Sequence, residues 1–527
     1  MSLIHHLDQL NSAENSKLLR GILRGIEKES LRVNQQGYLA TSHHPSGLGS
    51  ALAHPSITTD FSEALLEFIT APSTSVGQLL DELDEIHRFT YQQLDDELLW
   101  VSSMPCQLGA DSEIPIAEYG NSNIGTMKKV YRVGLGHRYG RAMQTIAGIH
   151  YNFSVPDDLW RLLQASEDSS QSLQAFKSEG YFGLIRNFRR YSWLLIYLLG
   201  AAPAVCKSFV KNRAHRLVPM GSDTHSLHTP YATSLRMGDL GYQSDAQSSL
   251  AICYNSLQQY IDSLGDALQQ PYAAYDSIGL KDQQGNYRQL NTNLLQIENE
   301  FYSTVRPKRT AESGETPLQA LNSRGVEYIE VRCLDVNPLV PGGIDRETVH
   351  FLDAFLLFCL LSPSPQMDDS ECAQIPDNLM RTVYSGRDPQ LQLMDIGGER
   401  GLRDWGLELI NLMQPVAKTL DSAQGEHCTD HRDAVNTMRE RLRDPQSTPS
   451  ARLLTQMQTN RETYYATAMG MAKQQRELFV QRPLDNQRLA HYRELAAASH
   501  RQQLAIEGAD SKTFDQFLAD YWQSSRR

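Results

Sequence analysis

Two carboxylates, Glu27 and Glu29, lie two residues apart in the segment GIEKESLRVN, residues 25–34, which alternates like a half-buried strand. On a strand such residues point to the same side and lie ~6.7 Å apart. Two carboxylates at that distance can each hold a different cation, or clamp a pair of cations that share a phosphate group. Without cations they would repel each other and destabilise the fold. The pair is therefore a candidate for metal-assisted chemistry on a phosphate.

Four further segments alternate polar and apolar residues with period two. They are LLEFIT (65–70), AGIHYNFSVP (147–156), LLQIENEFYS (294–303) and GVEYIEVRCLDVNP (325–338). Such alternation is typical of antiparallel strands with one face on an apolar core, so we expect an α+β fold in which helices back an antiparallel sheet. The polar faces are rich in acidic residues and carry Glu27, Glu29, Glu67, His150, Asn152, Glu298, Glu300, Glu330 and Arg332.

Each of these signals also has an ordinary structural explanation. A single pair of glutamates on a strand is more often a solvated edge, and His150 alone would more often be a hydrogen-bonded structural histidine. Arg332 beside Glu330 could be a surface ion pair. The repetition of acidic faces on four or five segments favours a metal site instead. Oxygen ligands with little sulfur prefer Mg²⁺, with Mn²⁺ as a possible substitute, over zinc.

A phosphate ligand would explain cations and arginine together. The chain contains neither G-x-x-x-x-G-K-[ST] nor G-x-G-x-x-G, which argues against a P-loop or a dinucleotide-binding fold. Arg332 and the run RPKR, residues 306–309, could neutralise a polyphosphate, although a basic run of this length is more often a solvated loop. The segment EHCTDHRD, residues 426–433, fits no standard zinc spacing and lies in a polar helical region, so we reject a zinc cluster there.

The composition excludes several classes of protein. The chain has 527 residues with a formal net charge of -13, and this acidic balance argues against nucleic acid as the main partner. The seven cysteines are scattered and form no C-x-x-C pair, so we expect reduced thiols in a cytoplasmic protein. The first residues lack the pattern of an export signal. The longest apolar run, residues 191–206, is interrupted by Gly200 and Pro203, which predicts a buried core helix and no membrane partner.

Helical periodicity dominates the rest of the chain, with clear cases at residues 76–99 and 345–361. After about residue 365 the chain becomes mostly helical and charged, with a turn-rich break at residues 443–452. The tail, residues 452–527, is expected to form exposed amphipathic helices whose charged face is solvated.

Seven segments together resemble glutamate–cysteine ligases of the gammaproteobacterial type. They are RGIEKESLRVN (24–34), TTDFSEALLEFIT (58–70), EYGNSNIG (118–125), YGRAMQTIAGIHYNFSVP (139–156), PYATSLRMGDLGY (230–242), LQIENEFYSTVRPKR (295–309) and GVEYIEVRCLDVNP (325–338). The resemblance is very specific from about residue 19 to 337, with Asn121 in place of an expected threonine, and loose at residues 207–228 and in the C-terminal third. We expect one catalytic unit over residues 1–527, with the sheet core at about 19–337 and a mainly helical region at about 365–527.

The resemblance implies a fold related to the catalytic domain of glutamine synthetase. In that family the sheet forms a funnel that takes ATP and metals at one end and amino acids at the other. Arg332 would lie at the transferring phosphoryl group, and Glu330 would belong to the catalytic set. The implied Mg²⁺ ligands are Glu27, Glu29, Asp60, Glu67, His150 and Glu330.

The resemblance also implies a pocket for cysteine, with Arg236 for the substrate carboxylate. Arginine can grip a carboxylate with two hydrogen bonds, and aromatic walls suit a small polarizable thiol. Without the resemblance, ordinary core packing would be the preferred explanation for these tyrosines. The other substrate-binding positions implied are Phe61, Tyr131, Leu135, Gln144, Asn152, Tyr242 and Tyr302.

The expected activity is ATP-dependent ligation of the γ-carboxylate of L-glutamate to the amine of L-cysteine, the first step of glutathione synthesis. Two other activities stay open on the residues: a ligase of the same fold with a different amine substrate, and a metal-dependent phosphohydrolase. A protein that only binds ligands would not need so destabilising a carboxylate cluster. We expect a monomer with small-molecule substrates and no nucleic-acid partner.

Overall fold

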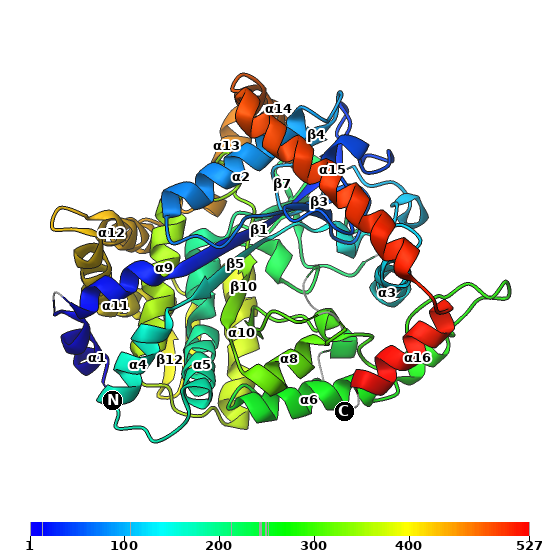
Figure 1. The fold of residues 1–527 in the computed structure, drawn as a ribbon. Helices are drawn as coiled ribbons and strands as arrows, with labels where there is room; N and C mark the ends of the chain where they lie inside the picture. The colour runs from blue at the N-terminus through cyan, green and yellow to red at the C-terminus, as the bar shows by residue number, and fades with distance from the viewer. Residues whose placement is uncertain are drawn as a thin grey trace.

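A computed structural model describes residues 2–12, 14–105, 107–211, 213–241, 245–247, 250, 252–312 and 314–525. Its centre is a seven-stranded antiparallel sheet in the order β2-β3-β1-β5-β10-β9, with β4 paired to β1 (Figure 1). The strands are β1 (Leu23–Val33), β2 (Ile57–Thr59), β3 (Leu65–Ile69), β4 (Leu98–Leu99), β5 (Ile149–Ser154), β9 (Val305–Lys308) and β10 (Tyr328–Leu334). The observed class is therefore mixed helix and antiparallel sheet, as the alternating segments predict.

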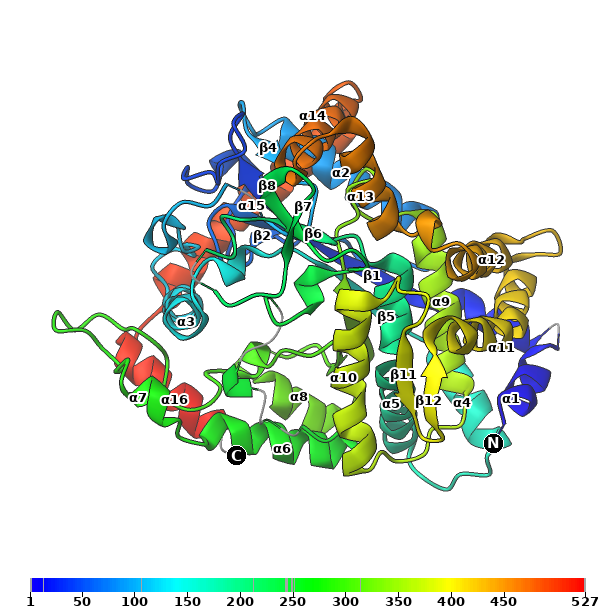
Figure 2. The ribbon, with the colours of Figure 1, turned by 180° about the vertical axis from the view of Figure 1, so that it is seen from behind.

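Helices surround this sheet and fill the C-terminal third of the chain (Figures 1 and 2). The helices are α1 (Leu3–Leu10), α2 (Val76–Tyr91), α3 (Asn123–Tyr139), α4 (Asp157–Ser166), α5 (Leu173–Leu199), α6 (Leu257–Gln269), α7 (Ala273–Asp276), α8 (Pro317–Arg324), α9 (Arg346–Leu361), α10 (Asp369–Ser385), α11 (Leu402–Gln424), α12 (Asp430–Arg443), α13 (Pro449–Asn460), α14 (Tyr464–Val480), α15 (Asn486–Ala509) and α16 (Phe514–Ser525). Two small sheets complete the fold: β6-β8-β7 from Ala204–Cys206, Asp223–His228 and Val218–Met220, and β11-β12 from Gln392–Asp395 and Gly398–Gly401.

The apolar face of the central sheet packs on helices, as the alternation predicts. Ile26, Tyr151 and Ile329 are fully buried, one on each of the neighbouring strands β1, β5 and β10. Helix α5 packs against β9 and β10, and α9 packs against α5. Because side chains on a strand alternate, burying this face turns Glu27, His150 and Glu330 to the opposite face.

Two expected elements end or fold differently from the sequence pattern. The helix expected over 76–99 ends at Tyr91, because Leu98 and Leu99 pair with β1 instead. The expected strand at 294–303 is wrong: residues Glu298–Glu300 form a 3₁₀ helix, η7. The segment is not a strand because the side chain of Glu300 is buried and accepts hydrogen bonds from other parts of the chain. Such tertiary bonds outweigh a weak local preference for a strand.

The expectation of reduced thiols is wrong at one position. Cys206, at the end of β6, is disulfide-bonded, whereas Cys253, Cys333, Cys359 and Cys372 are free, as is Cys428. Linear spacing does not report which cysteines lie close in space, and disulfide formation depends on that distance. Cys106 lies outside the described residues.

The apolar run at 191–206 belongs largely to α5, which is buried from Ser192 to its end at Leu199. Over the described residues, no helix combines the length and the apolar character that crossing a membrane would require.

Candidate active site

The register of the sheet brings the acidic residues of three strands together around a fourth strand, β5. Glu27 on β1 lies opposite His150 on β5, and Glu29 lies opposite Glu67 on β3. Glu330 on β10 lies opposite Asn152 on β5. In each of these pairs the two residues lie on neighbouring strands. The carboxylates therefore form a continuous patch across the polar face of the sheet. The local pattern of each segment and the strand order together produce this patch.

This patch forms one wall of a cavity of about 470 Å³, a volume that suits a small-molecule site. Most of the residues expected at the site line it. They are Glu27, Glu29, Asp60, Phe61, Glu67, Tyr131, Leu135, Gln144, His150, Arg236, Tyr302, Glu330 and Arg332. Tyr242 lies outside the described residues. Asn152 contacts the carboxylate patch, because its side-chain amide donates a 2.8 Å hydrogen bond to Glu27 Oε1.

His150 lies at the centre of the carboxylates. Its Nδ1 is 3.1 Å from Glu27 Oε2 and 3.8 Å from Glu330 Oε1, and its Nε2 is 3.8 Å from Glu29 Oε1. One ligand atom each from Glu27, His150 and Glu330 lies within 4.8 Å of the others, close enough to bind one ion together. Carboxylate oxygens with one imidazole form a donor set that accepts Mg²⁺ or Mn²⁺.

The carboxylates carry more negative charge than their surroundings offset. Burial raises the pKa of Glu67 well above its usual value, and the charges of Glu27 and Asp60 add to the rise. Burial and Asp60 raise the pKa of Glu29 as well. Glu330 differs: burial works against its charge, but Lys308 and Arg332 hold its pKa well below the usual value. The raised pKa values show that the charged forms of Glu29 and Glu67 are disfavoured in this group. A bound cation would stabilise these charged forms.

Basic side chains flank Glu330. Arg332 NH1 lies 3.2 Å from Glu330 Oε2, and Lys308 Nζ lies 3.3 Å from Glu330 Oε1. Arg306 and Lys308 belong to β9 and both line the cavity. The interpretation of the RPKR run as a solvated loop is therefore wrong for these two residues, and their spacing of two on a strand is the signal that places them on one side.

Helix α3 contributes two cationic residues, Lys128 and Arg132, that the sequence analysis did not single out. Both line the cavity, and Arg132 Nε donates to the Asp60 carbonyl while its guanidinium lies 4.6 Å from the Tyr119 ring centroid. They are four residues apart and so share one helix face. That spacing is the available signal, but it does not reveal which way the face points.

Aromatic and apolar side chains also line the cavity. Phe61 and Leu135 belong to a small buried cluster with Ile114, and Gln144 Nε2 donates a 3.0 Å hydrogen bond to the Tyr302 hydroxyl. Arg236, on the 3₁₀ turn Leu235–Met237, is 2% exposed and donates from NH2 to the Arg332 carbonyl at 2.9 Å. Arg236 is thus a buried cation in the lining of the cavity.

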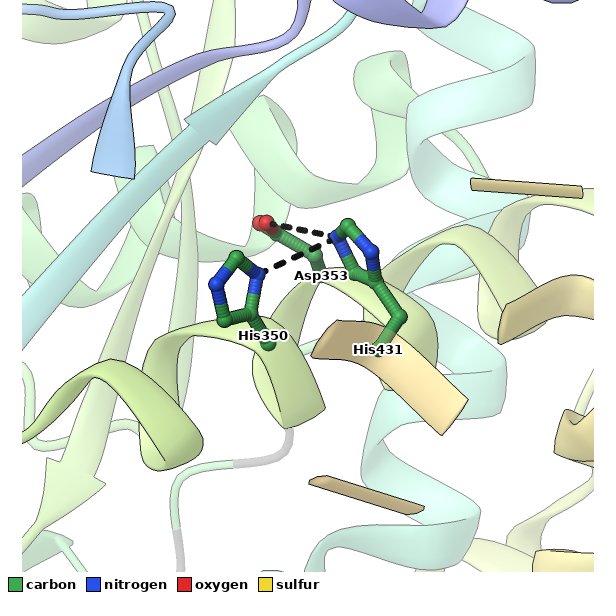
Figure 3. A group of neighbouring side chains, drawn as sticks. All are labelled: His350, Asp353 and His431. Atoms are coloured by element: carbon green, nitrogen blue, oxygen red, sulfur yellow. Dashed lines mark hydrogen bonds and ion pairs between the residues drawn. The ribbon is translucent and has the colours of Figure 1, made fainter. Parts of the chain in front are cut away.

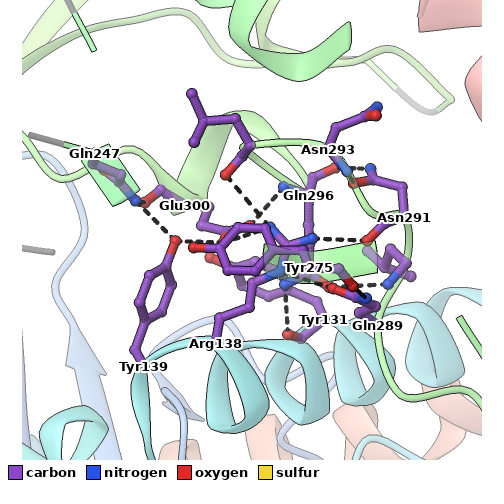
Figure 4. Close-up of polar contacts among 12 residues, drawn as sticks. Tyr131, Arg138, Tyr139, Gln247, Tyr275, Gln289, Asn291, Asn293, Gln296 and Glu300 are labelled. Carbon is purple, nitrogen blue, oxygen red and sulfur yellow. Dashed lines mark hydrogen bonds and ion pairs between the residues drawn. The ribbon is translucent and has the colours of Figure 1, made fainter. Parts of the chain in front are cut away.

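A buried polar network supports this part of the cavity lining (Figure 4). Glu300 Oε1 accepts hydrogen bonds from Arg138 NH1 at 2.9 Å and from the Tyr139 hydroxyl at 2.7 Å. Glu300 Oε2 accepts a hydrogen bond from the backbone nitrogen of Gln296 at 2.6 Å. Gln296 in turn donates to the Tyr131 carbonyl at 3.2 Å. The acidic residue Glu300, expected on a solvated strand face, therefore holds the wall of the cavity through hydrogen bonds.

The C-terminal tail reaches the site, whereas the sequence predicts exposed amphipathic helices with no part in binding. Helix α16 follows the long helix α15 and packs against α3 (Figure 1). Leu518 is buried with Met127 and Val130 of α3, and Tyr521 lines the cavity. An amphipathic pattern shows that one helix face is apolar, but not which surface of the protein that face covers.

Comparison with known proteins agrees with this geometry. The glutamate–cysteine ligase of Saccharophagus degradans is 50% identical over 98% of this chain and 97% of its own length, and that of Alcanivorax borkumensis is 49% identical over 98% and 99%. The crystal structure of the glutamate–cysteine ligase of Francisella tularensis in complex with AMP has a TM-score of 0.90, with 38% identity over 96% of this chain and 98% of its own. A family model described as glutamate–cysteine ligase matches residues 7–382. The chain belongs to the glutamate–cysteine ligase family.

Proposed function

We propose that this chain joins the γ-carboxylate of L-glutamate to the amine of L-cysteine with ATP, giving γ-glutamylcysteine, ADP and phosphate. Family membership supports the activity, which is the first step of glutathione synthesis. The single observation that carries the mechanism is one cavity lined by the carboxylate patch, by aromatic side chains and by the buried Arg236. We also propose that the sheet forms a funnel of the glutamine synthetase type and that the protein is cytoplasmic, and the proposed activity supports both.

The carboxylate patch fits Mg²⁺. Glu27, His150 and Glu330 would hold one ion, and Glu29, Asp60 and Glu67, which line the same cavity, would supply the other ligands. When bound, Mg²⁺ would offset the charge of the ATP phosphates. Mn²⁺ prefers the same oxygen ligands and is a possible substitute.

The residues around the patch explain how a carboxylate could be activated. Carboxylate and amine do not condense in water near neutral pH, so glutamate must first attack the γ-phosphoryl group of ATP. Arg332 and Lys308, both within 3.5 Å of Glu330, would stabilise the negative charge on the transferring group. The cysteine amine then attacks the acyl phosphate and expels phosphate. This path needs no nucleophile from the protein.

The assay that tests the activity is phosphate release in ATP and Mg²⁺, with glutamate and cysteine added singly and together. We expect release at a substantial rate only when both amino acids are present, because the acyl phosphate persists until an amine reaches it. Equal release from ATP alone would identify a phosphohydrolase. Release with glutamate and a different amine, but not with cysteine, would identify a ligase with another amine substrate.

Arg236→Ala should raise the KM for cysteine far more than the KM for ATP. Arg236 would pair with the cysteine carboxylate, and loss of a charge-assisted hydrogen bond costs about 1.5–3 kcal/mol, or roughly ten- to a hundredfold. Initial-rate kinetics with each substrate varied in turn measures both constants. Arg236→Lys keeps the charge and should recover part of the affinity. Equal defects for ATP and cysteine would remove Arg236 from this role.

A further inference from the structure

A second cluster of ligand-type side chains lies on the other side of the sheet from the active site. His350 and Asp353 are three residues apart on α9, and His431 is the second residue of α12 (Figure 3). All three are buried, and one ligand atom of each lies within 4.8 Å of the others. We propose that these three residues form a binding site for a transition-metal ion of the zinc class that joins α9 to α12.

The hydrogen-bond partners of His431 determine where its lone pair points. His431 Nδ1 lies 2.9 Å from Asp421 Oδ1, so Nδ1 carries the proton of a neutral ring. Nε2 then has a lone pair, and it lies 3.4 Å from His350 Nδ1 and 3.7 Å from Asp353 Oδ2. Three atoms of the kind that bind metals therefore converge. A metal ion between them would make this arrangement favourable, as would a proton on His350 Nδ1.

The distances favour a metal ion over a proton. A good hydrogen bond between nitrogen and oxygen spans about 2.7–3.2 Å, and both contacts of His431 Nε2 are longer. Donor atoms bonded to one tetrahedral zinc ion at about 2.0–2.1 Å lie about 3.4 Å from one another. The rings of His350 and His431 also meet edge to face, with centroids 4.6 Å apart, so their nitrogens converge without stacking.

Two of the three proposed ligands have the outer hydrogen-bond partner that a metal ligand needs, and the third has a carboxylate nearby. Asp421 holds His431, and the Tyr151 hydroxyl donates to Asp353 Oδ1 at 2.8 Å. His350 Nε2 is buried, has no hydrogen-bond partner among the described residues and lies 3.6 Å from Asp430 Oδ2. Partners of this kind fix the ring orientation of a metal-bound histidine.

Arg24 works against a cation at this position, because its Nε donates to Asp353 Oδ2 at 2.8 Å. The same oxygen has a second lone pair for the metal, and Asp421 and Asp430 add negative charge nearby. The site should therefore bind more weakly than a closed four-ligand site. Three protein ligands leave a fourth position for water.

The site would be structural and separate from the catalytic metals. It ties α12 to α9, whose Asp353 bonds the hydroxyl of Tyr151 on β5. Tyr151 lies between His150 and Asn152, so the ion would stabilise the strand that carries them. Residues 426–433 cannot reveal this site, since two of its three ligands lie about eighty residues earlier in the chain.

The test is zinc binding to the full-length protein, stripped with a chelator and titrated with zinc in excess Mg²⁺, which occupies the catalytic carboxylates. We expect about one zinc ion per chain that is retained in Glu27→Gln. His350→Ala and His431→Ala should each weaken zinc binding at least about a hundredfold, and Asp421→Asn, which keeps all three ligands, by about ten- to a hundredfold. Cobalt in place of zinc should give the visible absorption of a tetrahedral site.

His427→Ala is the matched control, because His427 is exposed on the same segment and should leave zinc binding unchanged. Circular dichroism checks that each variant folds, and Asp421→Asn tests the site even if the histidine variants do not. Zinc binding that is lost in Glu27→Gln but kept in the histidine variants would overturn the proposal. Absence of bound zinc from the wild-type protein would also overturn it and would assign a proton to His350 Nδ1 instead.

Discussion

Glu27→Gln and Glu330→Gln should each lower kcat by about a thousandfold or more, with the substrates and Mg²⁺ at saturating concentrations. Together with His150, these two residues form the three-residue group that could bind one metal ion. Glutamine keeps the size of glutamate but removes the charge, and loss of about 4 kcal/mol of charge stabilisation in the transition state corresponds to about a thousandfold in rate. Steady-state kinetics over a range of Mg²⁺ concentrations measures the effect.

Glu327→Gln is the matched control for Glu330→Gln. Glu327 lies three residues earlier, outside the cavity, where its carboxylate accepts from the Thr310 amide. Its variant should keep near-normal activity. Folding of the active-site variants is checked by thermal melting, and Glu67→Gln should keep or raise Tm because the surroundings of Glu67 disfavour its charged form. Near-normal turnover in Glu27→Gln or Glu330→Gln would count against the metal site.

Arg332→Ala should also reduce kcat by about a thousandfold, with a smaller effect on the KM for cysteine. The guanidinium lies beside Glu330 in the cavity, where it would stabilise the charge of the transferring phosphoryl group. An arginine in such a position contributes about 10³–10⁵ in rate in other phosphoryl-transfer enzymes. The readout is kcat together with the KM of each substrate.

Arg309→Ala controls for the loss of a positive charge near the site. Arg309 lies just beyond β9 and pairs with Glu327 at 3.7 Å, away from the cavity lining. We expect its variant to retain its activity. If Arg332→Ala instead raised only the KM for cysteine, Arg332 would be a substrate-binding residue and the phosphoryl role would be wrong.

The strands that carry the carboxylates could be predicted from the sequence because each has a local period-two pattern. Glu27 and Glu29 on β1 and Glu67 on β3 lie on the face that the alternation predicts. Their meeting in one patch could not be predicted from the pattern, because strand order and register depend on the whole chain. Only the resemblance to a known family indicates that these carboxylates form one metal site.

The wrong predictions for residues 294–303 and for the C-terminal tail have a common physical cause. Glu300 alternates like a strand residue, but its buried bond to Arg138 outweighs the local preference. Tyr521 belongs to a helix with an ordinary amphipathic pattern, and only the packing of α16 on α3 brings it into the cavity. In both cases contacts with distant parts of the chain decide the outcome. The expectations of a monomer and of one catalytic unit over the whole chain stay predictions.

The central claim is that glutamate attacks ATP directly and forms an acyl phosphate before the amide. In this path one oxygen of the glutamate γ-carboxylate leaves with the phosphate. With heavy oxygen in that carboxylate, and with ATP, cysteine and Mg²⁺ present, mass spectrometry of the inorganic phosphate should find one labelled oxygen for each turnover. Unlabelled phosphate from labelled glutamate, formed in step with the dipeptide product, would contradict the acyl-phosphate mechanism.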